Sequence, residues 1–344
     1  NTEVVYALFS DNSWGYHGLY KSIDGGDSWS LQSDTANILG RDPDGSSTGG
    51  QSWYDMTLAV STTDENHIYV GGICLWESTD GGITWNIEGA SGSSSRYSYM
   101  HVDHHAAEFN PLNNVAYVGN DGGIYKYFNL LNSWIDISDG LEISQFYKIG
   151  LSKNNDYVLV VGAQDNGTER LTGTTWDAIR GSDGMECIID EYNDDIIYST
   201  SQYGGLKVTY NGGVDWNNVK PVSYEGSWVT PWKIHPNNNN LIVAGYDEVY
   251  RSLTAGSAWT SIPYGQEIKT IALATSNFDY IYAGTYTSLK VTKDAGANWI
   301  NITPFFLNHS ITDVTVSSSD ADRVWVTLSG YALTHKVYES VNGG

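Results

Sequence analysis

Residues 22–29 of the chain read Ser-Ile-Asp-Gly-Gly-Asp-Ser-Trp, and residues 78–85 read Ser-Thr-Asp-Gly-Gly-Ile-Thr-Trp. In such a turn the Asp carboxylate and the Ser or Thr hydroxyl can accept hydrogen bonds from backbone N–H groups, while Gly allows a positive φ. Weaker copies end at Trp216, Trp259 and Trp299, two barely recognisable ones end at Trp134 and Trp176, and an eighth begins at Ser340. The Trp of each copy is expected to fill the gap between neighbouring sheets. The final tryptophans of successive copies lie between 40 and 56 residues apart, which predicts a tandem repeat of one structural unit.

The strands around these turns repeat as well. Residues 311–317, 323–328 and 336–340 read as the first, second and third strands of a unit, and the turn then leads to the fourth. Similar first and second strands recur at residues 56–61 with 67–71, 106–109 with 115–119, 147–151 with 157–161, 187–190 with 196–200, 231–235 with 241–245, and 269–274 with 280–284. We therefore predict an all-β fold: a β-propeller of four-stranded antiparallel blades, with about seven to eight blades visible and the turns between strands three and four.

A single propeller is expected to occupy residues 1–344. Its units are expected at about residues 1–50, 51–98, 99–142, 143–182, 183–226, 227–266, 267–308 and 309–344. The first unit lacks its first strand, because residues 3–9 already read as a second strand, and the eighth lacks its fourth. The chain starts at Asn1 without a signal-peptide pattern and stops within a turn, so we expect a mature secreted protein or a fragment of a larger one.

The composition of the chain excludes some partners and predicts the state of its cysteines. The chain has 40 Asp and Glu residues against 17 Lys and Arg, a formal net charge of −23, so we expect no nucleic-acid partner. It contains no run of 18 apolar residues, so no membrane insertion is expected. Cys74 and Cys187 fall in distant units and are expected to be buried free thiols.

One face of the predicted propeller carries unusual polar sequence. The repeated turns would share the opposite, lower face, where they build structure. The upper-face segments of blades two to five contain carboxylates, imidazoles, amides and aromatic rings, which together are typical of a polar ligand site. The candidate ligand-binding residues are Trp53, Tyr54, Asp55, His101, Asp103, His104, Asp121, Gln164, Asp165, Asp183 and Tyr203.

Each of these signals has an ordinary structural explanation beside the functional one. The Asp-Gly-Gly and Asp-Asn-Gly sequences are common turn formers. His104 and His105 point to opposite sides of a strand, so at least one is expected to pack in the sheet. Trp53 and Tyr54 can stack on a sugar or wedge between blades, and the residues alone do not choose between these.

Metal binding is only weakly indicated. His101, Asp103 and His105 stand at positions i, i+2 and i+4 and could share one face of a strand as metal ligands, but no further ligand set completes them. Residues 42–46 resemble the start of a calcium loop but lack the distal Glu. We therefore expect no cofactor, with calcium as the remaining alternative.

The repeated turn is the Asp-box, or BNR, pattern, and on it the chain resembles sortilin-type and xyloglucanase-type propellers. More closely, it resembles large secreted bacterial proteins that are described as glycosyl-hydrolase-like. The stretches that carry this second resemblance are residues 53–55, 70–72, 101–105, 119–123 and 164–168. The resemblance implies a secreted or cell-surface protein of bacterial origin.

Departures from the enzyme families weaken a catalytic interpretation. Resemblance to a sialidase would imply three arginines that clamp the carboxylate of the substrate. In this chain only Arg41 and Arg96 lie in plausible upper loops. A strongly negative chain would also repel an anionic sugar. A xyloglucanase-type enzyme places its catalytic Asp residues on two facing propellers, which one propeller cannot complete.

Three functional hypotheses follow. The favoured one is a secreted propeller that binds a neutral glycan or a peptide on the face formed by blades two to five. The second is a glycoside hydrolase that uses two carboxylates separated by about 5–10 Å across a cleft; its candidates are Asp55, Asp103, Asp121, Asp165 and Asp183. The third is a structural module of an extracellular assembly. The expected partner is a glycan, an extracellular protein or other domains of the same longer chain.

Overall fold

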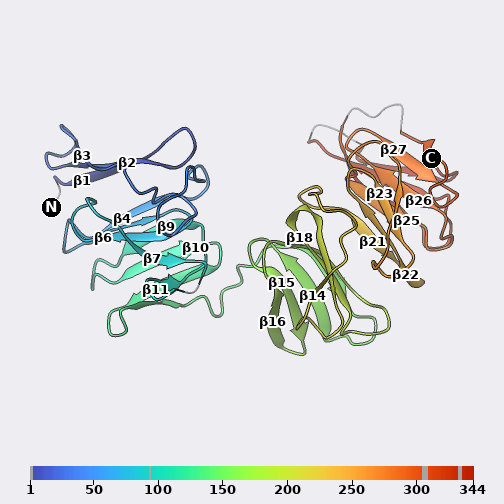
Figure 1. The fold of residues 1–344 in the computed structure, drawn as a ribbon, viewed down its shortest axis with the longest axis horizontal. Helices are drawn as coiled ribbons and strands as arrows, with labels where there is room; N and C mark the ends of the chain where they lie inside the picture. Colours follow the sequence, from blue (N-terminus) through green and yellow to red (C-terminus); the bar gives the residue numbers. More distant parts are fainter. Residues whose placement is uncertain (1–2, 93, 304–308, 332–334) are drawn as a thin grey trace. The chain divides into compact units, whose positions relative to one another are not determined.

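The computed structural model describes residues 3–92, 94–303, 309–331 and 335–344, and its regular structure is almost entirely β-strand (Figure 1). The described strands form eight sheets in chain order: five of four strands, two of three strands and one of five. Neighbouring strands are antiparallel except for one short pair, β7 with β8. The predicted fold class is confirmed, because these sheets are the antiparallel blades of a β-propeller.

The chain divides into two compact units, Asn1–Ile143 and Ser144–Gly344. The prediction of one propeller over the whole chain stays a prediction.

The first unit contains three sheets. The first sheet consists of β1 (Val5–Ser10), β2 (Tyr16–Ser22) and β3 (Ser30–Ser33). The second consists of β4 (Thr57–Val60), β5 (Ile68–Gly71), β6 (Leu75–Ser78), β7 (Asn86–Ala90) and β8 (Ser98–Tyr99). The third consists of β9 (His104–Phe109), β10 (Ala116–Asn120), β11 (Gly123–Phe128) and β12 (Ser133–Asp136).

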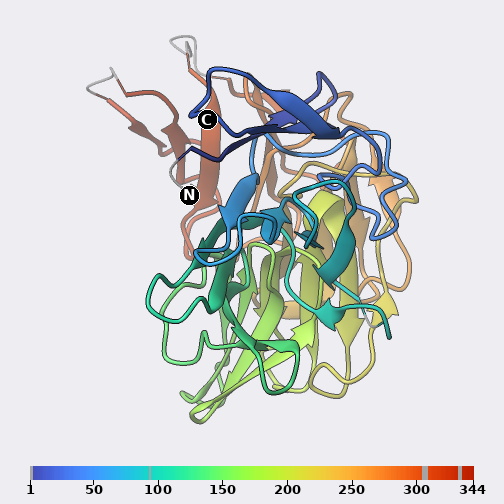
Figure 2. The same ribbon diagram turned by 90° about the vertical axis from the view of Figure 1, so that its left-hand side faces the viewer.

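The second unit contains five sheets, and Figure 2 shows the strands of the first two in green and yellow-green. These two are β13 (Phe146–Leu151), β14 (Val158–Ala163), β15 (Gly167–Thr172) and β16 (Thr175–Arg180), then β17 (Gly184–Ile189), β18 (Ile197–Ser201), the 3-10 turn η1 (Gln202–Gly204), β19 (Gly205–Thr209) and β20 (Asn217–Asn218). The next two are β21 (Trp232–His235), β22 (Asn238–Gly245), β23 (Val249–Ser252) and β24 (Thr260–Ile262), then β25 (Thr270–Leu273), β26 (Ile281–Gly284), β27 (Leu289–Thr292) and β28 (Ile300–Asn301). The last is β29 (Ile311–Val316), β30 (Val324–Leu328) and β31 (Val337–Ser340).

The repeated turns lie where the sequence predicts them, between the third and fourth strands of a blade. In the turn from β6 to β7, the buried Ser78 hydroxyl accepts the Gly82 N–H at 2.8 Å. The Asp80 carboxylate accepts the Thr84 N–H at 2.9 Å and the Thr84 hydroxyl at 2.6 Å. Hydrogen bonds of the same kind lower the pKa of Asp24 to about 2 in the turn from β2 to β3. The carboxylates of Asp24 and Asp80 therefore form their hydrogen bonds within the turns that contain them.

In two blades, the third and fourth strands are connected without this turn. Thr172 pairs with Thr175 at the end of the β15–β16 hairpin, so only two residues connect these strands. The β11–β12 connection is also short, because β11 ends at Phe128 and β12 begins at Ser133. The barely recognisable copies that end at Trp134 and Trp176 are thus ordinary hairpins.

Within each unit, the described hydrophobic clusters lie between successive sheets. Leu19 of the first sheet and Ile68 and Val70 of the second are fully buried in one cluster, and Trp85 packs against it. Burial of one such aliphatic side chain contributes roughly 1.5–3 kcal/mol. Trp29 by contrast is exposed, so a turn tryptophan does not always fill a gap between sheets.

Two further expectations concern the whole chain. Cys74 and Cys187 are both buried free thiols, as predicted. No helix among the described residues is long and apolar enough to cross a membrane.

Candidate functional site

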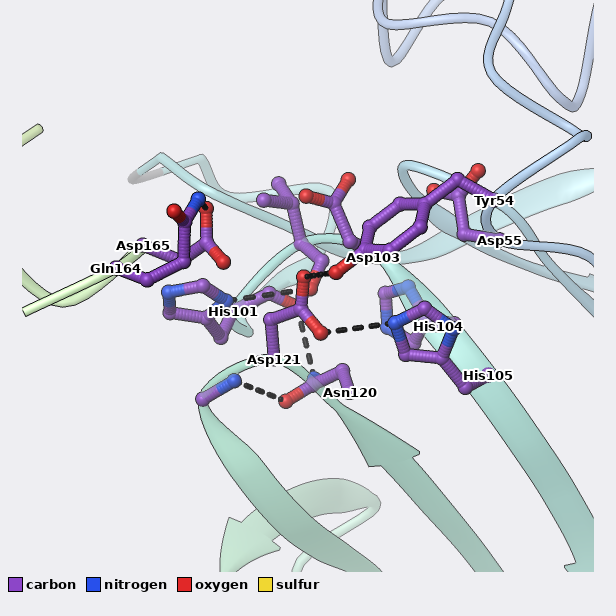
Figure 3. Close-up of polar contacts among 12 residues, drawn as sticks. Tyr54, Asp55, His101, Asp103, His104, His105, Asn120, Asp121, Gln164 and Asp165 are labelled. Atoms are coloured by element: carbon purple, nitrogen blue, oxygen red, sulfur yellow. Dashed lines mark hydrogen bonds and ion pairs between the residues drawn. The ribbon is translucent and has the colours of Figure 1, made fainter. Parts of the chain in front are cut away.

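Asp121 is the centre of a polar cluster in the first unit (Figure 3). It lies in the turn between β10 and β11, and one of its oxygens accepts the Tyr54 hydroxyl at 2.8 Å. The other oxygen is 2.8 Å from His105 Nε2. The Tyr54 and His105 rings also meet edge to face, with centroids 4.8 Å apart. The structure thus joins the segment before blade two to two elements of blade three.

The turn that carries Asp121 is held by its neighbours. Asn120 Nδ2 donates to the His101 carbonyl at 2.8 Å, and the Gly122 N–H donates to Asn120 Oδ1 at 3.1 Å. A Cβ on Gly122 would lie 2.4 Å from the His101 Cβ, so only glycine fits there. The Asp-Gly-Gly sequence therefore forms a turn and, at the same time, positions a carboxylate.

The Gln51 side-chain amide joins two further carboxylates, those of Asp55 and Asp103. Gln51 Nε2 donates to Asp55 Oδ2 at 3.1 Å and also to an oxygen of Asp103. Asp55 is 0% exposed, and its Oδ1 has no hydrogen-bond partner. Burial, with a contribution from the nearby Asp103 charge, raises the pKa of Asp55 to about 7. Asp55 is therefore a buried acid rather than a group that a ligand can touch.

His104 has a structural position. Its ring is fully buried, with Nδ1 2.9 Å from the Gly72 carbonyl and Nε2 3.1 Å from the Met100 sulfur. Burial lowers the pKa of His104 to about 4. Of the two adjacent histidines, His104 is the one that packs in the sheet, and His105 lies on the opposite side beside Asp121.

The three residues weakly suggested as metal ligands do not share one strand face. Asp103 has a φ of 65° and precedes β9, so the regular alternation begins only at the next residue. Asp103 contacts Gln51, whereas His105 contacts Asp121. His101 Nδ1 is 3.2 Å from the Val102 carbonyl. Among the described residues, His101, Asp103 and His105 do not form a group whose ligand atoms all lie within 4.8 Å of one another.

Trp53 and Tyr54 provide exposed aromatic surface at this cluster. Trp53 is 68% and Tyr54 45% exposed, and their rings are tilted with centroids 5.6 Å apart. A wedge between blades would be buried, so this exposure favours the ligand-stacking interpretation.

In the second unit, Gln164 is the centre of a separate network. The Tyr147 hydroxyl donates to its Oε1, and its Nε2 donates to Asp165 Oδ1 and to Asp183 Oδ1, each at 2.9 Å. Asp183 Oδ1 also accepts the Asp165 N–H at 3.0 Å. Burial raises the pKa of Asp183. The structure therefore brings together the predicted residues of blades four and five.

Aromatic rings border this network. Trp228 Nε1 donates to the Tyr147 hydroxyl at 3.0 Å. The Trp228 and Tyr203 rings meet edge to face at 5.1 Å, and the Tyr203 N–H donates to the Trp228 carbonyl at 3.1 Å. Tyr203 has a φ of 58°, an uncommon conformation for a residue with a side chain. Both rings remain 39% exposed.

The two carboxylates of the loop at residues 42–46 accept hydrogen bonds from neighbouring residues of the same segment. Asp42 Oδ2 accepts the Ser47 hydroxyl at 2.8 Å, and Asp44 Oδ1 accepts the Ser46 N–H at 3.0 Å. These are the bonds of a tight surface turn.

Three site residues were absent from the predicted set. Gln51 and Tyr147 lie in segments that enter blades two and four, and Trp228 lies in the segment that enters blade six. Their position at or just before the first strand of a blade was the available signal: Gln51 precedes β4, Tyr147 lies at the start of β13, and Trp228 precedes β21. Nothing in the residue types indicated that Gln51 would bridge two carboxylates.

The comparisons with known proteins give only distant likenesses. No protein-family model and no curated protein sequence matches the chain. Among solved structures, the GH74 enzyme of Niastella koreensis matches over 100% of this chain and 60% of its own, at 15% identity and a TM-score of 0.34. YCF48 from Cyanidioschyzon merolae matches over 84% of this chain and 83% of its own, at 15% identity and a TM-score of 0.43. U3-55K matches over 85% of this chain and 96% of its own, at 11% identity and a TM-score of 0.43. The chain thus spans 60% of the length of the GH74 enzyme, and likenesses of this degree say nothing about its activity or ligand.

Proposed function

We propose that the chain is a secreted or cell-surface propeller that binds a neutral glycan, with a peptide as the second possible ligand. The observation that carries the proposal is the exposed Trp53–Tyr54 pair, of which Tyr54 is held by its hydrogen bond to Asp121. A sugar ring offers C–H groups to an aromatic face and hydroxyl groups to a neighbouring carboxylate. An aromatic side chain held in one conformation loses little entropy when a ligand binds.

The second unit supports the same function through its own residues. Trp228 and Tyr203 are partly exposed, and the hydrogen bond from Trp228 to Tyr147 restricts the indole. Gln164 accepts the Tyr147 hydroxyl and donates to the Asp165 and Asp183 carboxylates, so amide and carboxylate groups lie near these rings. This pattern of apolar rings with a few fixed polar groups is typical of small-ligand sites.

The negative charge of the chain favours neutral glycans over acidic ones. The formal net charge of −23, together with carboxylates in both clusters, disfavours uronic acids, sialic acids and sulfated sugars. We therefore expect neutral hexose or pentose chains to bind and acidic ones to be rejected.

The finer assignment belongs to the same proposal. The internally bonded turns support membership of the Asp-box, or BNR, propellers, including the sortilin-type and xyloglucanase-type groups. The resemblance to large secreted bacterial surface proteins supports a bacterial, extracellular location. Its partners would then be a glycan, an extracellular protein or other domains of the same longer chain.

Hydrolysis is the alternative that a specific observation favours. A carboxyl group whose pKa is raised to about 7, such as Asp55, has the property of a general acid. Its burial, however, leaves no surface for a glycosidic oxygen. Asp183 accepts bonds from the Gln164 side chain and the Asp165 backbone, as a carboxylate that shapes a turn does. Binding is therefore favoured over catalysis.

A glycan array followed by calorimetry tests the proposal on the full chain. Trp53→Ala should weaken binding of the best array ligand by about tenfold or more, because an aromatic contact contributes on the order of 1.5 kcal/mol. Trp29→Ala is a control of the same residue type, since Trp29 is also exposed but belongs to a repeated turn. Equal loss in both variants would contradict the proposed site.

A reducing-sugar assay separates the alternatives. Sugar release that disappears in Asp121→Ala or Asp165→Ala would establish hydrolysis. Neither binding nor release would favour a structural module of an extracellular assembly.

A further inference from the structure

The loop between β1 and β2 is held in one conformation by its own hydrogen bonds. The Asp11 carboxylate accepts the Ser13 N–H at 2.8 Å and the Gly15 N–H at 2.9 Å, and the Trp14 N–H donates to the Asp11 carbonyl at 3.1 Å. Trp14 has a φ of 63°, a backbone conformation in which a bulky residue is an outlier. Trp14 is nevertheless 50% exposed. The loop therefore presents an aromatic residue to solvent from a strained backbone.

Backbone hydrogen bonds join this loop to the segment that enters blade two. The Gly50 N–H donates to the Ser13 carbonyl at 3.1 Å, and the Ser52 N–H donates to the Trp14 carbonyl at 3.2 Å. A Cβ on Gly50 would lie 2.5 Å from the Trp14 carbonyl oxygen, so glycine permits this close approach. Trp53, which is 68% exposed, follows Ser52 directly. Two exposed tryptophans are thus carried by segments that are bonded to one another.

The second unit contains the same arrangement in its own residues. Trp14 lies between β1 and β2, and Tyr203 lies between β18 and β19; in both blades these are the second and third strands. Tyr203 has a φ of 58°, and its N–H donates to the carbonyl of Trp228, in the segment that enters the next blade. Trp14 and Tyr203 are the two aromatic residues with a positive φ in the part of the chain that the structure describes. Trp14 therefore corresponds in the first unit to a residue already assigned to the site of the second.

The strained conformation of Trp14 is not explained by packing. Among the described residues, the hydrophobic cluster shared by the first two sheets does not include Trp14. Glycine would adopt the same backbone without steric cost, but it offers no aromatic ring. Strained residues of this kind gather at ligand sites, where the surrounding structure holds them in place. The exposed indole is therefore explained best by a contact with a ligand.

We propose that Trp14 forms a further sugar subsite beside Trp53 and Tyr54, so that the first unit binds a chain of neutral sugar residues rather than a single terminal sugar. This inference rests on the proposed function and extends it to the length of the ligand. Each aromatic face can cover one sugar ring, so two platforms on bonded segments accommodate an oligosaccharide. Asn12 and Ser13 are also exposed, and they offer an amide and a hydroxyl group to sugar hydroxyls.

Calorimetry on the full chain with cellohexaose, mannohexaose and xylohexaose, each compared with glucose, mannose or xylose, tests the subsite. The wild-type chain should bind at least one hexasaccharide about tenfold or more tightly than its single sugar, as one added aromatic contact allows. Trp14→Gly should remove most of this gain, and Trp14→Phe should keep most of it. Urea denaturation should show Trp14→Gly unfolding at the same or a higher urea concentration than the wild-type chain, because glycine relieves the strained φ.

Trp29→Ala is the matched control, since Trp29 is an exposed tryptophan of the same unit whose indole is bonded within a repeated turn. It should keep the dependence of affinity on ligand length. A hexasaccharide that binds equally to the wild-type chain and Trp14→Gly, but more weakly to Trp53→Ala, would overturn the subsite and leave the proposed function standing. Binding of none of the three hexasaccharides would also overturn the subsite, and the glycan array then decides the proposed function separately.

A structural role for Trp14 gives a different result. Trp14→Gly would then unfold at a lower urea concentration and lose affinity equally for the hexasaccharide and its single sugar, which would overturn the subsite. If Trp14→Gly does not fold, Trp14→Asn takes its place, because asparagine also adopts the left-handed backbone. Unchanged affinity of Trp14→Asn for the hexasaccharide would overturn the proposal.

Discussion

The Tyr54 hydroxyl donates a 2.8 Å hydrogen bond to Asp121, which lies 67 residues further along the chain. This bond joins the segment that enters blade two to the upper turn of blade three. It fixes an exposed aromatic ring beside a carboxylate, and both the stacking surface and the polar contact of the proposed site depend on it.

Tyr54→Phe should weaken glycan binding while leaving the fold nearly unchanged. The phenylalanine keeps the aromatic face but loses the hydroxyl, so the ring is less restricted and Asp121 loses a donor. We expect binding to weaken about threefold to tenfold, equivalent to about 1 kcal/mol. Calorimetry against the best array ligand measures the effect. Tyr192→Phe, at an exposed tyrosine of the second unit, should change nothing, and an equal effect there would contradict the role of Tyr54.

Gly184→Ala should destabilise the second unit strongly. A Cβ on Gly184 would lie 1.9 Å from the Gly167 carbonyl oxygen, and backbone cannot move aside as a flexible side chain can. We expect a loss of about 3 kcal/mol or more in the free energy of unfolding, measured by urea denaturation. Gly181→Ala is the matched control three residues away, where an added Cβ meets no atom within 4 Å. Similar midpoints for the two variants would show that the close approach is absent.

Ser78→Ala should destabilise the first unit by about 1–3 kcal/mol, because it leaves the Gly82 N–H without its acceptor in a buried turn. Urea denaturation measures the difference. Ser95→Ala removes an exposed hydroxyl from the same unit and should be neutral within about 0.5 kcal/mol. A neutral Ser78→Ala would mean that the turn hydrogen bonds contribute nothing to stability.

Glu88 should make stability fall as the pH rises. Burial, with a contribution from Glu77, raises the pKa of Glu88 to about 7 from an ordinary value of 4.5. The folded chain therefore binds a proton at this site that the unfolded chain has released between these values. The stabilising contribution is complete below about pH 4.5 and is lost progressively up to about pH 7.

Glu88→Gln should remove that part of the pH dependence. An amide oxygen can still accept the Trp134 indole N–H, which lies 3.3 Å from Glu88 in the native chain. At pH 8 the variant should be more stable than the wild-type chain, by on the order of 1 kcal/mol after allowance for solvent screening. Denaturation at pH 5, 6, 7 and 8 measures both chains. Parallel stability profiles would rule out Glu88 as the titrating group.

The sequence predicted the fold well because its signals are local. Alternation of Tyr and Val identified the strands, and the Ser-x-Asp-Gly-Gly turns marked the connection between β6 and β7 and its counterparts. The same alternation predicted that one of His104 and His105 packs in the sheet, and His104 is that residue.

The site was predicted only as a set of segments, because its geometry depends on pairs that are distant in sequence. Gln51 reaches Asp103 across 52 residues, and Trp228 reaches Tyr147 across 81. Asp103 also adopts a left-handed backbone conformation, which removes it from the strand pattern on which the metal interpretation rested. No single-sequence periodicity contains such information.

The repeated turns have an evolutionary and kinetic consequence. In the eighth copy the Gly344 N–H donates to the Ser340 hydroxyl at 2.8 Å, the same bond that Gly82 makes with Ser78. Because each of these bonds spans only four residues, a turn can form early and without help from other blades, as contacts of low sequence separation do. A gene encoding such units can gain or lose one of them by recombination, because each remaining turn still contains all the residues that form its hydrogen bonds. Blade number then becomes a variable that selection can change, while the chemistry of the upper-face segments changes independently.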